Sequence, residues 1–174
     1  SIYNKVKEAY KSGEKVVGIV HATGTGKTYI ALQLLLDNPS MKSLFIVPSN
    51  AIIEHIIETI SECGLSLEHD FPNLEFATYQ SLTTKSDEEL ASMDIDMLVL
   101  DEFHHIGAPV WGEQVNKIVD SHPDIKVFGM TAYTVRDRNT SYERDMALPG
   151  GNELFSDKIV STYDIYDAMC DGVL

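Results

Sequence analysis

Residues 16–28 read VVGIVHATGTGKT, and this stretch decides the fold. It opens with an unbroken apolar run, Val16 to Val20, which is typical of a buried parallel strand. A turn rich in Gly and Thr follows, and then the apolar stretch Ile30 to Leu36, which predicts a helix. Glycines let the backbone curl so that successive N–H groups point at one anion, and a helix N-terminus adds partial positive charge. The stretch therefore predicts a phosphate-binding loop between a strand and a helix.

Lys27 and Thr28 close this loop. Lys27 would reach the β- and γ-phosphates of a nucleotide, and the Thr28 hydroxyl would complete a magnesium shell. The strict pattern has Gly where this chain has His21. The alternative, a turn that precedes a lysine by chance, is disfavoured because strand, turn, Gly-Lys-Thr and helix occur in the required order. The candidate nucleotide-binding residues are Ala22, Thr23, Gly24, Thr25, Gly26, Lys27 and Thr28.

Apolar runs alternate with helical stretches along the rest of the chain. Further strands are predicted at 44–47, 74–79, 97–100 and 125–130, and helices at 2–10, 30–36, 52–60 and 87–91. Strands joined by helices of this length predict an α/β domain whose parallel sheet is covered on both faces. Such sheets bind ligands beyond the carboxyl ends of their strands. We expect one domain over 1–174, with a loop and a last helix leaving the core over 137–174.

A second acidic motif follows the predicted strand at 97–100. Asp101 would lie at the upper edge of the sheet beside the magnesium, and Glu102 would polarise an attacking water. Water activation indicates hydrolysis, whereas a kinase must exclude water. The alternative is a strand followed by a solvated acidic turn. The candidate catalytic residues are Glu102, Lys27 and Asp101, and the candidate magnesium ligands are Thr28 and Asp101.

The charge and composition of the chain limit which kinds of partner it can bind. The 174 residues are 44% hydrophobic and carry a net charge of −14. Residues 1–50 have six Lys and three acidic residues, whereas residues 51–100 have one Lys and eleven acidic residues. Nucleic-acid binders usually show a basic footprint, so any nucleic-acid contact must be local or shared with a missing part. No apolar run approaches the roughly 18 residues of a membrane span, which predicts no membrane partner. Two cysteines favour a reducing cytoplasm.

Asp101-Glu102-Phe103-His104 resembles the box of superfamily 2 helicases of the DExH type. Three more segments, at 45–49, 78–82 and 129–132, resemble motifs of this superfamily in the same order. Within it, the sequence looks most like the motor subunits of type I and type III restriction enzymes and related bacterial helicases, in which a His in the phosphate loop is common. The match spans roughly residues 16–136.

The resemblance implies a three-layer, RecA-like domain that binds ATP and Mg²⁺ and is the first half of a two-domain motor. The second RecA-like domain would carry arginine fingers. DNA is favoured over RNA only by the restriction-type resemblance. The residues that the resemblance assigns to coupling are His104, Thr131 and Ala132. Those that it assigns to nucleic-acid binding are Pro48, Ser49, Thr78, Gln80 and Ser81.

The chemistry of the strand-binding segments can also be argued from the residues. Ser49 is a good N-cap that leaves helix amides for an anion, and Thr78, Gln80 and Ser81 are uncharged donors that hold phosphates without reading bases. Ordinary capping after a strand is the alternative for both segments. Tyr79 could stack on a base, but its alternation with neighbouring apolar residues favours packing on the sheet.

The sequence departs from the family pattern at three places. Tyr133 stands where the family usually has Thr, which affects the coupling motif. No Gln precedes the loop to read adenine, and the chain begins with Ser1, so we expect the natural protein to extend further upstream. Three arginines follow the coupling motif, at 136, 138 and 144, and none is assigned as a finger.

A zinc site at His104-His105 is disfavoured because no further ligand has the required spacing.

Two functional hypotheses from different classes stay open. The leading one is the ATP-binding half of a nucleic-acid-dependent ATPase, a helicase or DNA translocase with weak activity on its own. The alternative is a nucleotide-dependent binding or switch module without unwinding activity. A P-loop kinase would suit the loop but not Asp101-Glu102.

Overall fold

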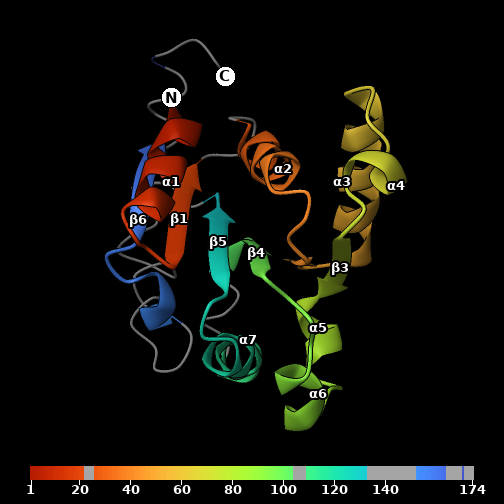
Figure 1. The fold of residues 1–174 in the computed structure, drawn as a ribbon, viewed down its shortest axis with the longest axis vertical. Helices are drawn as coiled ribbons and strands as arrows, with labels where there is room; N and C mark the ends of the chain where they lie inside the picture. The colour runs from red at the N-terminus through yellow and green to blue at the C-terminus, as the bar shows by residue number, and fades with distance from the viewer. Residues whose placement is uncertain (22–25, 104–108, 133–151, 164–169, 171–174) are drawn as a thin grey trace.

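Six strands form one sheet with the order β3-β2-β4-β5-β1-β6 (Figure 1). The structure, a computed structural model, describes residues 1–21, 26–103, 109–132, 152–163 and 170. Every strand pairing among these residues is parallel. The strands are β1 (Val16–His21), β2 (Ser43–Val47), β3 (Leu74–Thr78), β4 (Met97–Asp101), β5 (Lys126–Thr131) and β6 (Ile159–Tyr163).

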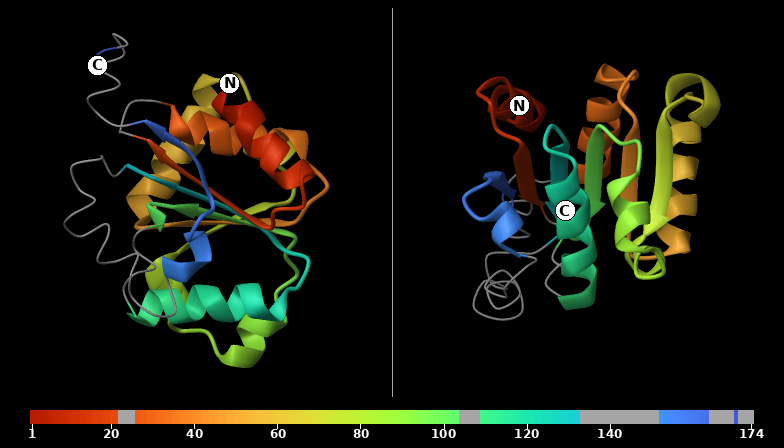
Figure 2. Two further views of the ribbon diagram at one scale, coloured as in Figure 1. Left: turned by 90° about the vertical axis from the view of Figure 1, so that its left-hand side faces the viewer. Right: turned by 60° about the horizontal axis from the view of Figure 1, so that its bottom comes forward.

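Helices cover both faces of the sheet, so the domain has three layers (Figure 2). One face carries α1 (Ile2–Lys11), α2 (Lys27–Asp37), α3 (Asn50–Glu62) and the short α4 (Leu67–Asp70). The other carries α5 (Tyr79–Leu82), α6 (Asp87–Ala91), α7 (Pro109–Ser121) and the 3₁₀ helix η3 (Asn152–Phe155). The predicted α/β class with a parallel central sheet is confirmed.

The continuous apolar runs follow from this layering. In β4, Met97 and Val99 belong to the core on the α1–α3 side, whereas Leu98 and Leu100 belong to the core on the α5–α7 side. Successive residues of a strand point to opposite faces, so a strand covered on both sides needs apolar residues at every position. The strands predicted at 16–20, 44–47, 97–100 and 125–130 all lie in the sheet.

The prediction that residues 137–174 form a loop and a helix leaving the core is wrong for residues 152–163. There β6 pairs with β1, and Phe155 of η3 is fully buried. The strand escaped prediction because its sequence, IVSTY, mixes apolar and hydroxyl residues, as an edge strand does. The predicted loop at 137–151 lies outside the described residues, as does the predicted last helix apart from Cys170.

The sequence predicts no helix over residues 109–121, where the structure has α7. It begins at Pro109, a residue suited to the first helical turn, and buries Val115, Ile118 and Val119. Gly112 interrupts its apolar pattern, and in the structure this glycine is buried. Tyr79, predicted as the end of a strand, is instead the first residue of α5.

Candidate active site

The carboxyl ends of β1 and β4 form the candidate site, with β5 between them. Gly26 has φ +85°, a left-handed conformation that favours glycine, and α2 begins directly after it at Lys27. Residues Ala22 to Thr25 of the predicted loop lie outside the described residues. The first turn of α2 therefore places Lys27 and its backbone amide at the end of β1, as the phosphate-loop prediction requires.

Two carboxylates face Lys27 from the end of β4. Asp101 is the last residue of the strand and is buried, and Glu102 follows with φ +49°. Lys27 Nζ lies 3.6 Å from Glu102 Oε1, and both side chains are largely shielded from solvent, with exposed fractions of 12% and 24%. The structure thus brings Lys27 together with two carboxylates that lie 74 and 75 positions further along the sequence.

Burial and charge act in opposite directions on Asp101. The pKa of Asp101 is raised to about 6, chiefly by burial and also by the charge of Glu102, while the charge of Lys27 and a hydrogen bond from the Glu102 N–H act to lower it. A buried carboxylate beside a second carboxylate is a setting that a cation would stabilise.

The few described oxygen ligands at this edge suit Mg²⁺ bound together with a nucleotide, and they do not form a metal site made of protein ligands alone. The described residues contain no group of three or more His, Cys, Asp or Glu that could hold a metal. Mg²⁺ in nucleotide sites uses one or two protein oxygens together with phosphate oxygens and water. Asp101 at the end of β4 and Thr28 in the first turn of α2 supply that number.

His21, in the position where the strict loop pattern has Gly, is fully buried. Its Nε2 lies 2.9 Å from the Ser161 hydroxyl of β6. The pKa of His21 is lowered to about 4, chiefly by burial and also by the nearby charges of Lys27 and Lys5. The imidazole is therefore neutral at pH 7 and packs against the edge strand that the sequence did not predict.

The stability of the chain is expected to fall by about 2 kcal/mol between pH 7.5 and pH 5 because of His21. The folded pKa of about 4 lies below the usual 6.5, so the unfolded state binds the extra proton as the pH falls. The stabilisation is complete above about pH 6.5 and is lost toward pH 4. Urea unfolding of the wild type and of His21→Asn across this range measures it. Equal pH dependence in both proteins would contradict this account.

The two segments predicted to bind nucleic acid follow β2 and β3. Pro48 is half-buried, and Ser49 is exposed at the N-cap of α3. Thr78 Oγ1 accepts a hydrogen bond from Ser81 N (3.1 Å), and Ser81 Oγ donates to Thr78 O (2.7 Å). Thr78 thus caps α5, as the alternative interpretation held, the Ser81 hydroxyl is bonded back to the cap residue, and their contact with nucleic acid stays a prediction.

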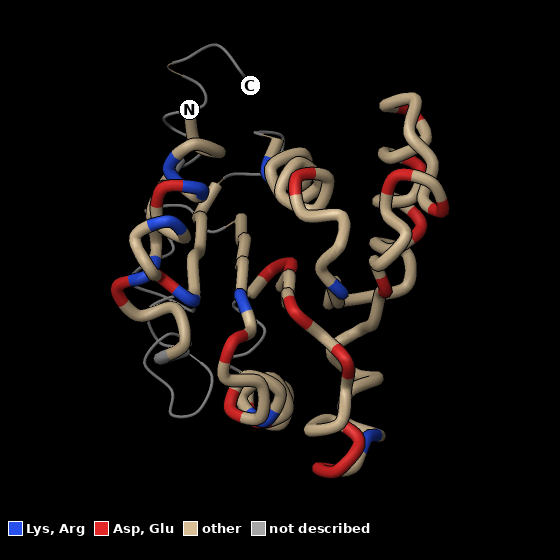
Figure 3. The backbone as a smooth tube through the Cα atoms, viewed as in Figure 1, with Lys and Arg blue, Asp and Glu red and all other residues tan. Residues whose placement is uncertain are grey.

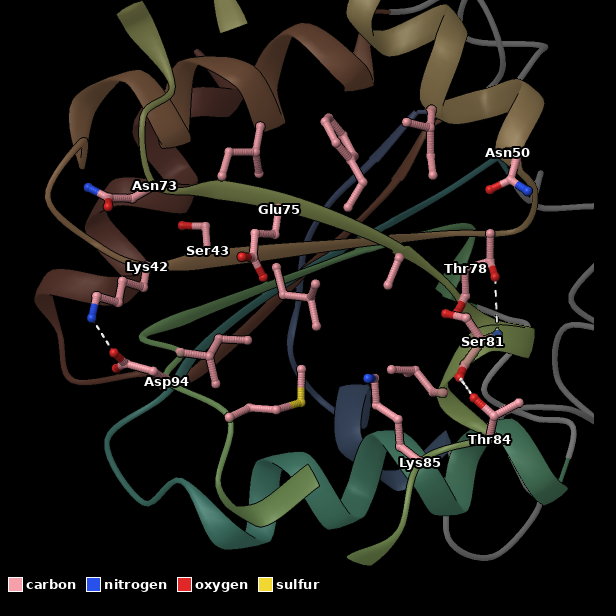
Figure 4. A pocket seen from close by; sticks show the side chains of 18 of the residues that line it. Lys42, Ser43, Asn50, Asn73, Glu75, Thr78, Ser81, Thr84, Lys85 and Asp94 are labelled. Atoms are coloured by element: carbon pink, nitrogen blue, oxygen red, sulfur yellow. Dashed lines mark hydrogen bonds and ion pairs between the residues drawn. The ribbon is translucent and has the colours of Figure 1, made fainter. Parts of the chain in front are cut away.

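A groove of about 900 Å³ runs along the open edge strand β3 (Figure 4). Asn50, Thr78 and Ser81 lie at one end of it, and the ion pair Lys42–Asp94 lies at the other. The described residues that line it do not include Lys27 or the two carboxylates. This groove therefore meets the predicted strand-binding segment and not the carboxylate pair.

Tyr79 and Trp111 were not assigned to the site from the sequence. Tyr79 is fully buried, which confirms packing and excludes its stacking on a base in this conformation. Its hydroxyl donates to the backbone oxygen of Asp101 (2.7 Å), and its ring stacks on Trp111 with centroids 5.5 Å apart. Trp111 Nε1 donates to Gln80 Oε1 (3.3 Å). Only the tertiary contact could have revealed this link.

The structure places part of the predicted coupling motif. Thr131 ends β5 and is fully buried, opposite Val20 of β1, and the half-buried Ala132 follows it. Because β5 lies between β1 and β4, Thr131 sits at the same edge as Lys27 and Asp101. His104, Tyr133 and the three arginines lie outside the described residues, so the coupling role stays a prediction.

Negative charge gathers away from this edge (Figure 3). Acidic residues cluster on α3, α4 and α6, whereas α1 carries Lys5, Lys7 and Lys11. The uneven charge seen in the sequence thus corresponds to separate helices.

The sequence model of a family described as "Type III restriction enzyme, res subunit" matches residues 1–136. The chain belongs to this family. A curated relative, the type I restriction enzyme EcoAI endonuclease subunit of Escherichia coli, is 23% identical over 189 residues, which cover 98% of this chain. This res-family chain spans only 22% of that relative.

Solved structures show the same fold. The Escherichia coli DEAH/RHA helicase HrpB superposes with a TM-score of 0.63 at 18% identity, covering 92% of the res-family chain and 21% of HrpB. The Pyrococcus furiosus Hef helicase domain superposes with a TM-score of 0.58 at 16% identity, covering 97% and 39% of the two chains. The domain is therefore a helicase-like RecA domain, close to restriction-enzyme subunits. Among the described helices, none has the length and apolar character to cross a membrane.

Proposed function

We propose that the chain is the ATP-binding half of a nucleic-acid-dependent ATPase of the helicase or DNA translocase type. The observation that carries this proposal is the contact between Lys27 and Glu102, which brings the phosphate loop and the acidic motif together at one edge of the sheet. A lysine beside two carboxylates at a helix N-terminus suits the hydrolysis of a nucleoside triphosphate.

Each residue has a role in this proposal. Lys27 and the first amides of α2 bind the phosphates, and Thr28 and Asp101 hold Mg²⁺. The ion supplies charge neutralisation on the phosphate oxygens when it is bound. Glu102, shielded from bulk solvent and held near Lys27, orients the attacking water by accepting a hydrogen bond from it. Lys27 must leave Glu102 to reach a phosphate, so nucleotide binding would free the carboxylate for water.

Nucleic acid would contact Pro48, Ser49, Thr78, Gln80 and Ser81 through its backbone, and DNA is favoured because the relatives are restriction-enzyme subunits. The coupling residues His104, Thr131 and Ala132 would link nucleotide state to this surface. A second RecA-like domain would supply arginine fingers, each worth about 10³–10⁵ in turnover. That domain would also add the positive charge that this acidic chain lacks.

A nucleotide-dependent switch module without unwinding activity is the second candidate. The acidic helix α3, which borders the groove through Asn50 and Ile53, favours it because its charge repels a nucleic-acid backbone. Turnover that no DNA or RNA stimulates in the complete protein would support this candidate over the motor.

Lys27→Ala is expected to weaken binding of a fluorescent ATP analogue with Mg²⁺ by about 100-fold, because a buried charge-assisted contact to phosphate is lost. Binding is measured by anisotropy titration of the chain. Lys42→Ala is the matched control, since Lys42 is an exposed lysine paired with Asp94 far from the site. Unchanged affinity in Lys27→Ala would contradict the proposed phosphate site.

A further inference from the structure

Tyr79 connects the segment after β3 to the end of β4. The sheet order places β2 between these strands, so the Tyr79 side chain crosses the carboxyl end of β2. Its hydroxyl donates to the backbone oxygen of Asp101 at 2.7 Å, and the side chain has no exposed surface. This hydrogen bond joins the predicted strand-binding segment directly to the acidic motif.

The peptide that joins Asp101 to Glu102 is held from both of its polar ends. Tyr79 binds its carbonyl oxygen, and its N–H donates to the Asp101 carboxylate. Glu102, at the end of this peptide, has a φ angle of +49°. Residues other than glycine adopt this backbone conformation when surrounding contacts hold them in it. The orientation of this peptide sets the direction in which the Glu102 side chain leaves the backbone.

Helix α7 fixes Tyr79 from the other side. The Trp111 ring stacks on the Tyr79 ring at an interplanar angle of 15°, and Trp111 Nε1 donates to Gln80 Oε1. Gln114 Nε2 donates to Leu82 O at 2.8 Å. The segment 78–82 is thus bound to α7 by three contacts and to β4 by one, so a displacement of this segment reaches the Asp101–Glu102 peptide.

We propose that Tyr79 is a positioning residue that transmits binding of a nucleic-acid backbone at segment 78–81 to the water-orienting Glu102. The inference rests on the proposed function. Backbone contacts at Thr78, Gln80 or Ser81 would shift the start of α5, the Tyr79 hydroxyl would move with it, and the Asp101–Glu102 peptide would turn. Tyr79 itself touches neither nucleotide nor nucleic acid.

The test compares Tyr79→Phe with Tyr10→Phe in the complete protein. Tyr10 is the matched control because its partly buried hydroxyl also donates to a backbone oxygen, that of Val127 at 2.6 Å, at the opposite end of the sheet. We expect the melting temperature of the two variants to fall by a similar amount relative to the wild type. Tyr79→Phe should also lower nucleic-acid-stimulated kcat by about 3–10-fold, the loss of one hydrogen bond, with KM for ATP and affinity for nucleic acid unchanged.

Trp111→Phe is a second variant. It keeps an aromatic ring against Tyr79 but removes the N–H contact to Gln80 and part of the stacked area, so we expect a smaller fall in stimulated kcat in the same direction. If nucleic acid stimulates ATP turnover of the wild type, and stimulates Tyr79→Phe as strongly as Tyr10→Phe, the inference is overturned while the proposed function stands. If no DNA or RNA stimulates the wild type, the proposed function fails, and the inference fails with it.

Discussion

Glu102→Gln is expected to lower ATP turnover of the complete protein by about 10²–10⁴-fold, because the amide cannot accept a proton from water. Nucleotide binding should persist. The substitution keeps the size of the side chain and removes one negative charge next to the phosphates, and Lys27 loses a partner that competes for it at 3.6 Å. Steady-state turnover and analogue binding, measured on the same preparation, separate the two effects.

Glu14→Gln is the matched control for this experiment. Glu14 also pairs with a lysine, since its Oε2 lies 2.8 Å from Lys158 Nζ, but this pair is at the surface and away from the carboxyl edge of the sheet. Its loss should leave turnover unchanged, because exposed pairs contribute little. Normal hydrolysis by Glu102→Gln would show that another group orients the water.

Phe155→Ala is expected to destabilise the chain by about 3–5 kcal/mol, the usual cost of truncating a fully buried Phe. The Phe155 ring stacks on Phe103 with centroids 4.2 Å apart. It also fills the space over two glycines of the sheet: a Cβ at Gly129 would lie 2.3 Å from Phe155 Cζ, and one at Gly18 would lie 2.9 Å from Cδ1. Without the ring, β1, β5 and the turn after Glu102 border a cavity.

Urea unfolding measures this loss, and Phe76→Ala provides a graded comparison. Phe76 is a half-buried Phe on the edge strand β3, stacked on Phe45 at 5.7 Å, so its truncation should cost less. A loss for Phe155→Ala no larger than that for Phe76→Ala would mean that η3 and β6 contribute little to the fold. A parallel measurement of nucleotide affinity would show whether the turn that carries Glu102 depends on this packing.

Local sequence predicted β1, β2, β4 and β5 because each is buried on both faces, and it predicted the edge strand β3 although Glu75 of that strand is exposed. Such a strand must be apolar at every position, and a continuous apolar run is visible in the sequence. The edge strand β6 gave no such run, since only part of it is buried and Ser161 faces His21. Helix α7 was missed for a related reason: its buried face includes Gly112 and Gln114, so its apolar residues do not recur at a clear helical spacing.

For the candidate site, the sequence predicted the identities of Lys27, Asp101 and Glu102 and the edge at which they lie. It could not predict that Thr78 would cap α5 or that the Ser81 hydroxyl would donate to Thr78 O, because hydroxyl side chains after a strand suit both helix capping and phosphate binding. Nor could it predict the role of Tyr79, whose alternation with apolar neighbours indicated burial but not the partner of its hydroxyl.

The sequence by itself determined the parallel α/β fold and predicted the phosphate loop and the acidic motif, because strand burial and loop chemistry are properties of short segments. The tertiary structure alone decided which distant residues meet. The sheet order puts β5 between β1 and β4, so Lys27 reaches Glu102, and it puts β2 between β3 and β4, so Tyr79 reaches Asp101. Strand order depends on how helices pack across the whole sheet, which no local pattern encodes.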